Sequence, residues 1–203
     1  MIAPVVRHRG LSDYEPTWRA MQAFTRERDA ATPDELWFVE HPAVYTLGLA
    51  GREEHVLAPG AIPVVRTERG GQVTYHGPGQ LVAYTLVDLK RAGRGVREHV
   101  RRLEQSVIEL LEQYGVTAER QAGMPGVYVG GAKISAVGLR VSRGCTYHGI
   151  ALNADVDLAP FAGIDPCGYP GLASTRLADL GVRDKIETVQ RLWEKHLLAM
   201  LTR

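Results

Sequence analysis

Apolar residues recur at intervals of three and four in three parts of the chain, a pattern typical of amphipathic helices. The first part is 14–29, the second is 96–114, and the third is 184–201. In the second, Gly115 follows the last apolar position, where a helix often ends on a glycine. The apolar stripe of the third comprises Ile186, Val189, Trp193, Leu197 and Met200. The sequence therefore predicts three helices, each with one buried face.

Short runs rich in β-branched and aromatic residues predict strands between these helices. The runs are 36–39, 44–47, 64–65, 81–89, 126–129, 132–141 and 146–156. Gly130 and Gly131 alone separate two of them, a spacing typical of a tight β-hairpin. Strands and helices neither alternate regularly nor segregate along the chain. We therefore expect an α+β fold with a mixed, mostly antiparallel sheet flanked by helices.

Length and composition suit one folded unit. The 203 residues lie within the usual size of one domain, so we expect a single catalytic domain over 1–203. The net charge of +1 provides no overall attraction to nucleic acid. No segment approaches the roughly 20 apolar residues of a membrane span, and the first ten residues lack the apolar core of a signal peptide. We expect a cytoplasmic protein that is not bound to membranes.

The two cysteines, Cys145 and Cys167, cannot form a disulfide framework, and their spacing does not match a zinc site. We therefore expect no metal. Arginine is concentrated in one place, a loop leading into the second helix. This arginine group comprises Arg91, Arg94, Arg97, Arg101 and Arg102. It could bind an acidic partner, although such a run of charge also occurs on ordinary solvated faces.

A glycine-rich segment, 69–80, lies between two predicted strands. Glycines let a ligand approach the backbone closely, and exposed N–H groups can hold a carbonyl oxygen or an anion. The segment lacks the spacings of dinucleotide and Walker loops, so neither kind of nucleotide site is supported. It is a candidate binding loop, and the alternative is a turn with a bulge. His76 within it is, taken alone, more typical of a structural histidine.

Two residues are candidates for covalent chemistry. Cys167 lies in a stretch rich in proline and glycine, 165–171, where a thiol can be partly exposed and act as a nucleophile. The alternative is a small buried apolar side chain, which is also how we interpret Cys145. Lys133 follows the predicted hairpin turn among small and apolar residues, which would partly desolvate its amine; a solvated lysine is the alternative. The 34 positions between Lys133 and Cys167 do not show whether they meet.

Taken together, these stretches resemble the octanoyl-carrier-protein:protein octanoyltransferases, also called lipoyl(octanoyl) transferases. The resemblance runs from about Tyr14 to Leu177. Its motifs are Val39-Glu40-His41-Pro42, Arg69 to Gln80, Gly126 to Val129, Lys133-Ile134, Gly138-Leu139-Arg140, His148-Gly149, Leu152-Asn153 and Pro166-Cys167-Gly168. It implies a fold similar to the catalytic domains of lipoate and biotin protein ligases.

The resemblance also implies a site. The family's catalytic pair falls on Cys167 and Lys133, and its acyl pocket is bounded by three stretches. These correspond to Arg69, Gly70, Gly71, Gln72, Val73, Thr74, Tyr75 and His76, to Ala136, Val137 and Gly138, and to Gly149, Ile150 and Ala151. His148 is expected beside the pocket, and we expect it and His76 to organise the pocket rather than to act as acid–base catalysts.

The activity implied is transfer of an octanoyl group from acyl carrier protein, through a thioester on Cys167, to a lysine of a lipoyl domain. Acceptors would be the lipoyl domains of 2-oxoacid dehydrogenases and the H protein of glycine cleavage. We expect no cofactor and a monomer.

Three alternatives stay open: an ATP-dependent lipoate or biotin protein ligase, an amidotransferase between lipoyl-type domains, and a non-catalytic binding domain. The ligase has no need of a nucleophilic thiol, and neither has the binder. The preferred donor distinguishes the amidotransferase, which would take the acyl group from an acylated protein lysine rather than from a carrier-protein thioester.

Overall fold

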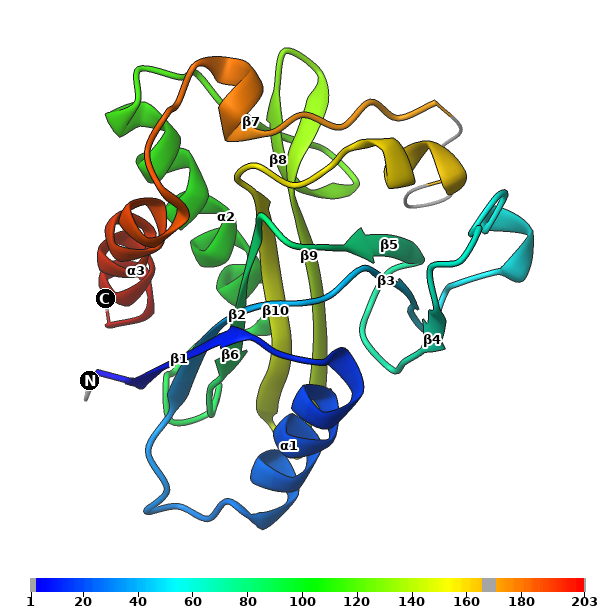
Figure 1. Ribbon diagram of the computed structural model, residues 1–203. Helices are drawn as coiled ribbons and strands as arrows, with labels where there is room; N and C mark the ends of the chain where they lie inside the picture. The colour runs from blue at the N-terminus through cyan, green and yellow to red at the C-terminus, as the bar shows by residue number, and fades with distance from the viewer. Residues whose placement is uncertain (1–2, 166–170, 203) are drawn as a thin grey trace.

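A seven-stranded sheet forms the centre of the molecule (Figure 1). The computed structural model describes residues 3–165 and 171–202. The strand order is β1-β2-β6-β10-β9-β8-β7, and only β1 and β2 are parallel neighbours in this sheet. The strands are β1 (Val5–Leu11), β2 (Glu35–Glu40), β6 (Gln80–Leu86), β7 (Glu119–Gln121), β8 (Met124–Val129), β9 (Ala132–Ser142) and β10 (Cys145–Asn153).

A smaller sheet of three strands extends from the central one. It has the order β4-β3-β5, with strands β3 (Val44–Leu47), β4 (Val64–Arg66) and β5 (Val73–His76). Its own apolar cluster includes Tyr45, Tyr75 and Ile164. The 3₁₀ segments η1 (Glu53–His55) and η2 (Ala159–Gly163) lie in the connections beside it, and a third, η4 (Leu177–Leu180), precedes the last helix.

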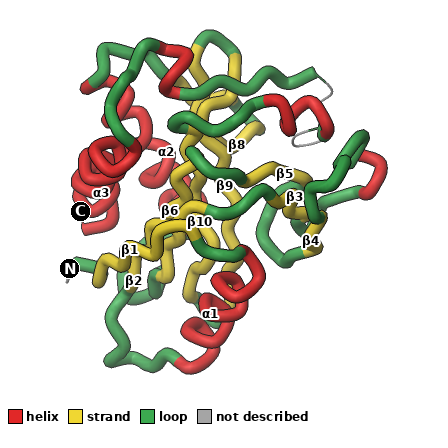
Figure 2. The backbone as a smooth tube through the Cα atoms, viewed as in Figure 1, coloured by secondary structure: helices red, strands yellow, loops and turns green. Residues whose placement is uncertain are grey.

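Helices cover both faces of the central sheet, as Figure 2 shows. Helices α2 (Val96–Gln113) and α3 (Ile186–Thr202) pack together on one face, and α1 (Tyr14–Glu27) lies on the other. Successive strand residues point to opposite faces. Leu36 and Phe38 of β2 therefore join the core under α2 and α3, while Trp37 and Val39 pack toward α1. Because both faces are covered, β2 is apolar throughout its centre.

The predicted fold class is confirmed, and the predicted helices and hairpin form close to their expected bounds. Gly130 and Gly131 have φ of 54° and 83°, the conformation that a two-residue hairpin turn requires. The expectation of a loop throughout 69–80 is wrong, because β5 lies within it. The terminal strands β1 and β7 were not predicted. β1 is mostly exposed and rich in arginine, and β7 is only three residues long, so neither has the apolar pattern of a strand.

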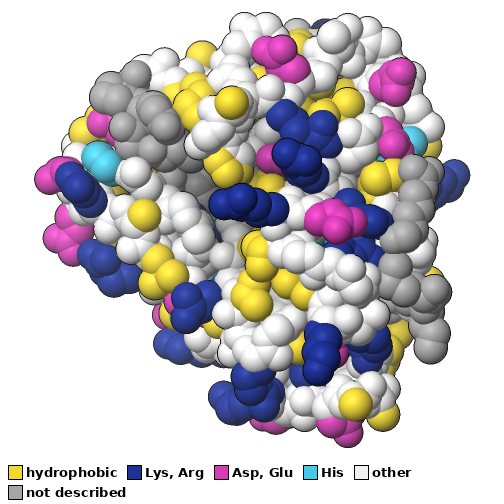
Figure 3. Space-filling model, turned by 180° about the vertical axis from the view of Figure 1, so that it is seen from behind, with side chains coloured by type: hydrophobic (Ala, Val, Ile, Leu, Met, Phe, Trp, Pro, Cys, Tyr) yellow, Lys and Arg dark blue, Asp and Glu magenta, His cyan; other side chains and the backbone are white. Residues whose placement is uncertain are grey.

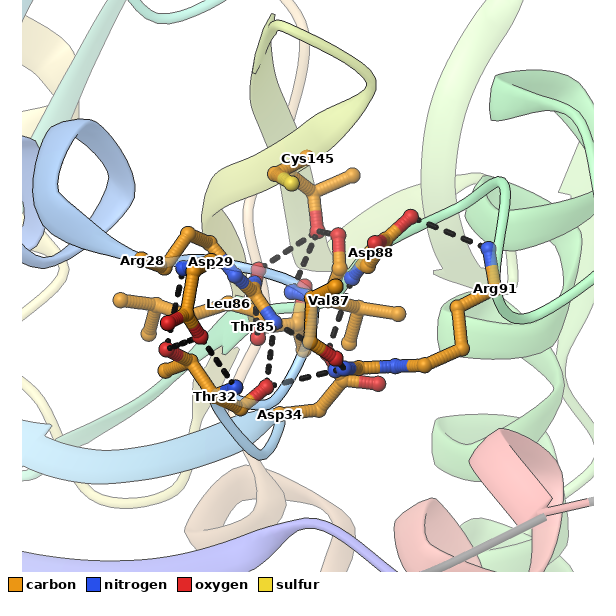
Figure 4. Close-up of polar contacts among 12 residues, drawn as sticks. Arg28, Asp29, Thr32, Asp34, Thr85, Leu86, Val87, Asp88, Arg91 and Cys145 are labelled. Atoms are coloured by element: carbon orange, nitrogen blue, oxygen red, sulfur yellow. Dashed lines mark hydrogen bonds and ion pairs between the residues drawn. The ribbon is translucent and has the colours of Figure 1, made fainter.

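A polar cluster fixes the connection between α1 and β2 to the end of β6 (Figure 4). The Asp34 carboxylate accepts hydrogen bonds from Arg28 at 2.7 Å and from Arg91 at 2.6 Å, and also from the Asp88 backbone N–H. Arg28 is almost fully buried and also donates to the Leu86 carbonyl. The paired charges and these hydrogen bonds make this corner part of the structural framework. Within the described residues, no helix carries an apolar stretch long enough to cross a bilayer.

Candidate functional site

A pocket opens between the central sheet, the small sheet and the start of α1. Its empty volume is about 810 Å³, including solvent at the mouth. Twelve of the fourteen residues expected to bound the acyl pocket line it, together with Lys133 and His148. Gly70 and Tyr75 do not. Tyr75 instead packs between Tyr45 and Phe161, and Gly70 anchors the loop by donating its N–H to the Leu139 carbonyl at 2.8 Å.

Two glycines that face each other across β9 and β10 form part of the pocket wall. Gly138 pairs with Gly149 in the ladder. A Cβ on Gly138 would lie 3.1 Å from the Gly70 carbonyl oxygen, and one on Gly149 would lie 1.9 Å from the Ala83 carbonyl oxygen. Larger residues would therefore push the glycine-rich loop and β6 away from β9 and β10. The wall depends on close backbone packing, which glycine alone permits.

Lys133 lies near the beginning of β9 and is buried, with 6% of its surface exposed. Its Nζ donates to the Pro125 carbonyl oxygen at 3.3 Å and lies 5.2 Å from the centre of the Tyr128 ring. The carbonyl and the aromatic face both favour a cation. Gly126, with φ of 130°, directly precedes Val127, after which the register between β8 and β9 shifts. A Cβ on Gly126 would lie 2.4 Å from the Ser135 carbonyl oxygen, so only glycine fits there. The expected desolvation of this lysine is thus present in the structure.

A later segment of the chain pairs with the backbone of Lys133. The N–H of Lys133 donates to the Ala173 carbonyl at 2.8 Å, and the N–H of Thr175 donates to the Lys133 carbonyl at 3.0 Å. Ala173 lies eight positions after Asp165, whose own N–H donates to the His55 carbonyl. Cys167 lies between the two anchors and outside the described residues, so its role stays a prediction.

Two buried histidines contact each other near the pocket: His76, within the glycine-rich segment, and His41, which follows β2. His76 stacks on Tyr14 at a ring distance of 5.9 Å, and its Nδ1 lies 2.6 Å from Gln80 Oε1. Burial lowers the pKa of His76 to about 3 and that of His41 to about 4. Both rings are therefore neutral near pH 7. His76 is therefore unsuited to storing a proton at the pocket, and its role as an organiser of the pocket stays a prediction.

His148 has an unusual backbone for a strand residue, with φ of 62°. Such conformations are strained for residues with a Cβ and persist only where the surroundings hold them. Its Nε2 lies 3.6 Å from Glu68 Oε1, and burial, partly opposed by that carboxylate, lowers the pKa of His148. Burial alone would raise the pKa of Glu68, but the nearby His148 imidazole and the hydrogen bond from Trp18 lower it to about 2. A neutral ring beside a carboxylate thus closes this side of the pocket.

The Arg69 side chain is used to hold the wall together. It is 7% exposed, and its guanidinium donates to Thr46 Oγ1 and to the carbonyls of Thr46, Gly70 and Gln72. These bonds connect β3 to the glycine-rich loop. Its place at the pocket is therefore as a brace between two backbone segments, a role that sequence motifs did not reveal.

The arginine group is only partly available to a partner. Arg94 is buried and donates to the carbonyls of Met200 and Leu201, and Arg91 pairs with Asp34, so both belong to the framework. Arg97 and Arg101 are exposed, and they line a groove between α2 and the β7–β8 hairpin that reaches Pro125 at the pocket. Seen from behind, basic side chains are spread over the surface around hydrophobic ones (Figure 3).

Cys145 is 8% exposed, and burial raises the pKa of its thiol. Both properties agree with an unreactive side chain. Within 3–165 and 171–202, no three histidine, cysteine or acidic side chains cluster as metal ligands.

Several pocket residues were missed by the sequence interpretation: Tyr14, Tyr84, Ser135 and Phe161. No motif marked the last three, and Tyr14 was seen only as part of a helix.

Known proteins share both the sequence and the fold. A family model described as the lipoyl protein ligase A/B catalytic domain matches residues 13–197. An octanoyltransferase from Thiobacillus denitrificans is 63% identical over 187 residues, covering 92% of this chain and 86% of the relative. Another, from Aromatoleum aromaticum, is 60% identical over 201 residues, covering 99% of this chain and 85% of the relative.

Solved structures of low identity share the fold. Lipoate-protein ligase A bound with ATP has a TM-score of 0.81 at 16% identity, covering 98% of this chain and 86% of its own. Biotin protein ligase from Aquifex aeolicus has a TM-score of 0.58 at 14% identity, covering 98% and 69%. The expected similarity in fold to lipoate and biotin protein ligases is confirmed.

Proposed function

Because the chain belongs to the octanoyltransferases of the lipoyl protein ligase A/B catalytic-domain family, we propose that it moves an octanoyl group from octanoyl-acyl carrier protein to a lysine of a lipoyl domain. Cys167 carries the acyl group as a thioester between the two steps, and Lys133 acts with it. We assign the reaction to a cytoplasmic monomer. The acceptors are the lipoyl domains of 2-oxoacid dehydrogenases and the H protein of glycine cleavage.

The position of Lys133 is the observation that carries this proposal. Its amine is buried at the pocket, and its backbone is bonded to the segment that follows the Cys167 stretch. Cys167 precedes Ala173 by only six positions and follows Asp165 by two. A lysine that is desolvated beside a cysteine is a suitable partner for a thiolate.

The lining of the pocket is suited to an apolar acyl chain. Val73, Val82, Val137 and Ile150 contribute apolar side chains to its lining. Each buried CH₂ of a ligand contributes about 0.8 kcal/mol, so a chain of eight carbons gains several kcal/mol from such a site. No carboxylate of Asp or Glu lines the pocket among the described residues.

In the first step, Lys133 Nζ accepts the thiol proton, and the Cys167 thiolate attacks the carbonyl carbon of the donor thioester. The new C–S bond forms, the tetrahedral intermediate collapses, and the carrier's thiol leaves with the proton from Lys133. Backbone N–H groups of the glycine-rich wall stabilise the oxyanion.

In the second step, the neutral amine of the acceptor lysine attacks the thioester carbonyl, and the C–N bond forms. The C–S bond then breaks, Cys167 leaves as the thiolate, and the proton that the amine loses passes to Lys133 Nζ. Two protein substrates therefore take turns at one site, and ping-pong kinetics are expected.

Intact mass spectrometry tests the proposal directly. The purified chain is mixed with octanoyl-acyl carrier protein without ATP, and wild type is compared with Cys167→Ala and Lys133→Met. We expect one octanoyl adduct on wild type, none on Cys167→Ala, and slow formation on Lys133→Met. Cys145→Ser is the matched cysteine control and should acylate normally.

Two other outcomes separate the alternatives. Transfer that requires free octanoate and ATP would make the protein a ligase and Cys167 a bystander. An adduct that forms only from an octanoylated lipoyl-type domain would identify an amidotransferase.

A further inference from the structure

Hydrogen bonds between buried side chains run along one wall of the pocket toward the backbone of Lys133. We call this set the polar row, and its members are Arg69, Thr46, His76, Gln80 and Asn153. Each of them is at most 7% exposed. Asn153 Nδ2 ends the row by donating to the Thr175 carbonyl at 3.0 Å. Thr175 is the residue whose N–H donates to the Lys133 carbonyl.

The polar row has one direction. Arg69 Nε donates to Thr46 Oγ1 at 2.9 Å, so the Thr46 proton is directed to His76 Nε2, 3.5 Å away. Gln80 Oε1 can only accept, and His76 Nδ1 is therefore the donor across 2.6 Å.

Gln80 Nε2 then donates to Asn153 Oδ1 at 2.9 Å. A guanidinium at one end cannot accept and a carbonyl at the other cannot donate. A missing donor within the row therefore cannot be replaced by reversing its neighbours.

The strand register brings the last two members together. Gln80 opens β6, Asn153 closes β10, and the two are partners in the antiparallel ladder. Gln80 also donates to the Tyr75 carbonyl at 3.2 Å, which fixes the orientation of its amide. The orientation of the Asn153 amide is thus fixed by Gln80. Asn153 donates to the Thr175 carbonyl, while the Thr175 N–H donates to the Lys133 carbonyl.

We propose that Asn153, oriented by Gln80, is a positioning residue that holds the 173–175 segment against Lys133 and thereby sets how Lys133 meets the Cys167 thiol. This inference rests on the proposed function, since it concerns the Cys167 and Lys133 pair. Asn153 acts through the Thr175 backbone. Its loss should change the reactivity of the thiol even when no substrate is present.

The test measures the rate at which iodoacetamide alkylates Cys167 between pH 5 and 10. The full-length chain carries Cys145→Ser, so that one thiol is followed by intact mass. Asn153→Leu removes both bonds of the side chain without adding charge, and Gln80→Met removes the group that orients it. Thr146→Val is the matched control. It lies in the same strand and removes a buried donor to the Thr85 carbonyl, at 2.7 Å.

We expect the alkylation midpoint of Asn153→Leu to rise by about one pH unit, which slows alkylation near neutral pH about tenfold. Gln80→Met should shift it in the same direction by less, and Thr146→Val should lower the melting temperature without shifting the midpoint. If Lys133→Met shifts the midpoint but folded Asn153→Leu does not, the inference fails and the proposed function stands.

If no variant shifts the midpoint, Lys133 and Cys167 are not a pair, and the proposed function fails as well. Gln80→Met carries the same decision if Asn153→Leu does not fold.

Discussion

Replacing Gly149 by alanine is expected to force β10 away from β6. The ideal Cβ would lie 1.9 Å from the Ala83 carbonyl oxygen and 3.0 Å from both the Ala83 carbonyl carbon and the Tyr84 Cα. All three are backbone atoms in the neighbouring strand, so no side chain can rotate to make room. Since contacts under 3.0 Å essentially never occur for a Cβ, the strands must separate by about 1.1 Å there, the difference between 3.0 and 1.9 Å.

Overpacking a core costs about 1–3 kcal/mol and occasionally more. Gly149→Ala should lie at the upper end, because its ladder partners are Tyr84 in β6 and Gly138 in β9, both in the middle of the sheet. For a chain of this size, 1 kcal/mol corresponds to roughly 2–4 °C in melting temperature. The expected loss is therefore roughly 6–12 °C.

Differential scanning calorimetry measures this loss, and the acylation assay measures its effect on the pocket. Gly138→Ala is a graded comparison, since its Cβ would meet the Gly70 carbonyl at 3.1 Å. Gly95→Ala is the open-space control, because nothing lies within 4 Å of the added Cβ. A Gly149→Ala melting temperature within 2 °C of wild type would refute the argument, as would an equal loss in Gly95→Ala.

Two further predictions follow from charges. The free energy of unfolding should be highest above about pH 6.5, the pKa of an unperturbed histidine. It should fall as the pH drops below that value toward the pKa values in the folded state, about 4 for His41 and about 3 for His76. The unfolded chain protonates first there, and a melting temperature that stays constant from pH 7 to 4.5 would contradict this. The double change Arg97→Glu and Arg101→Glu should slow acylation of the enzyme by octanoyl-acyl carrier protein roughly tenfold at low salt. It should not change the rate of acylation by a small octanoyl thioester. The control variant Lys195→Glu, on α3, should leave both rates unchanged. If the double variant and the wild type were acylated by the carrier protein at equal rates, the groove would not bind the donor.

Periodicity predicted the elements that bury one or both faces. The α2 stripe and the runs in β2 and β10 were predictable because their apolar spacing follows directly from burial. β1 was not, since it is an exposed edge strand whose pairing is set by β2. β5 was hidden by the glycines around it, although Val73 and Tyr75 alternate with polar residues as a strand should.

The site was predictable where motifs carried it and not where tertiary contacts did. The resemblance marked the three stretches that line the pocket and the position of Lys133. It did not reveal that Arg69 is a brace, because its acceptors are backbone carbonyls up to 23 residues away. It did not reveal the exclusion of Arg94 from the surface either, since that depends on the end of α3, more than 100 residues later.

The chemistry of the pocket is placed at one end of the central sheet. Lys133 is the second residue of β9, Asn153 is the last of β10, and Gln80 is the first of β6. Because β6, β10 and β9 are antiparallel neighbours, these three strand ends lie together at one end of the sheet. Side chains there can change without breaking the ladders that hold the core, which suits a fold shared with ATP-binding ligases at 16% identity. The functional differences within this fold should therefore be concentrated at these strand ends and in the segments bonded to them.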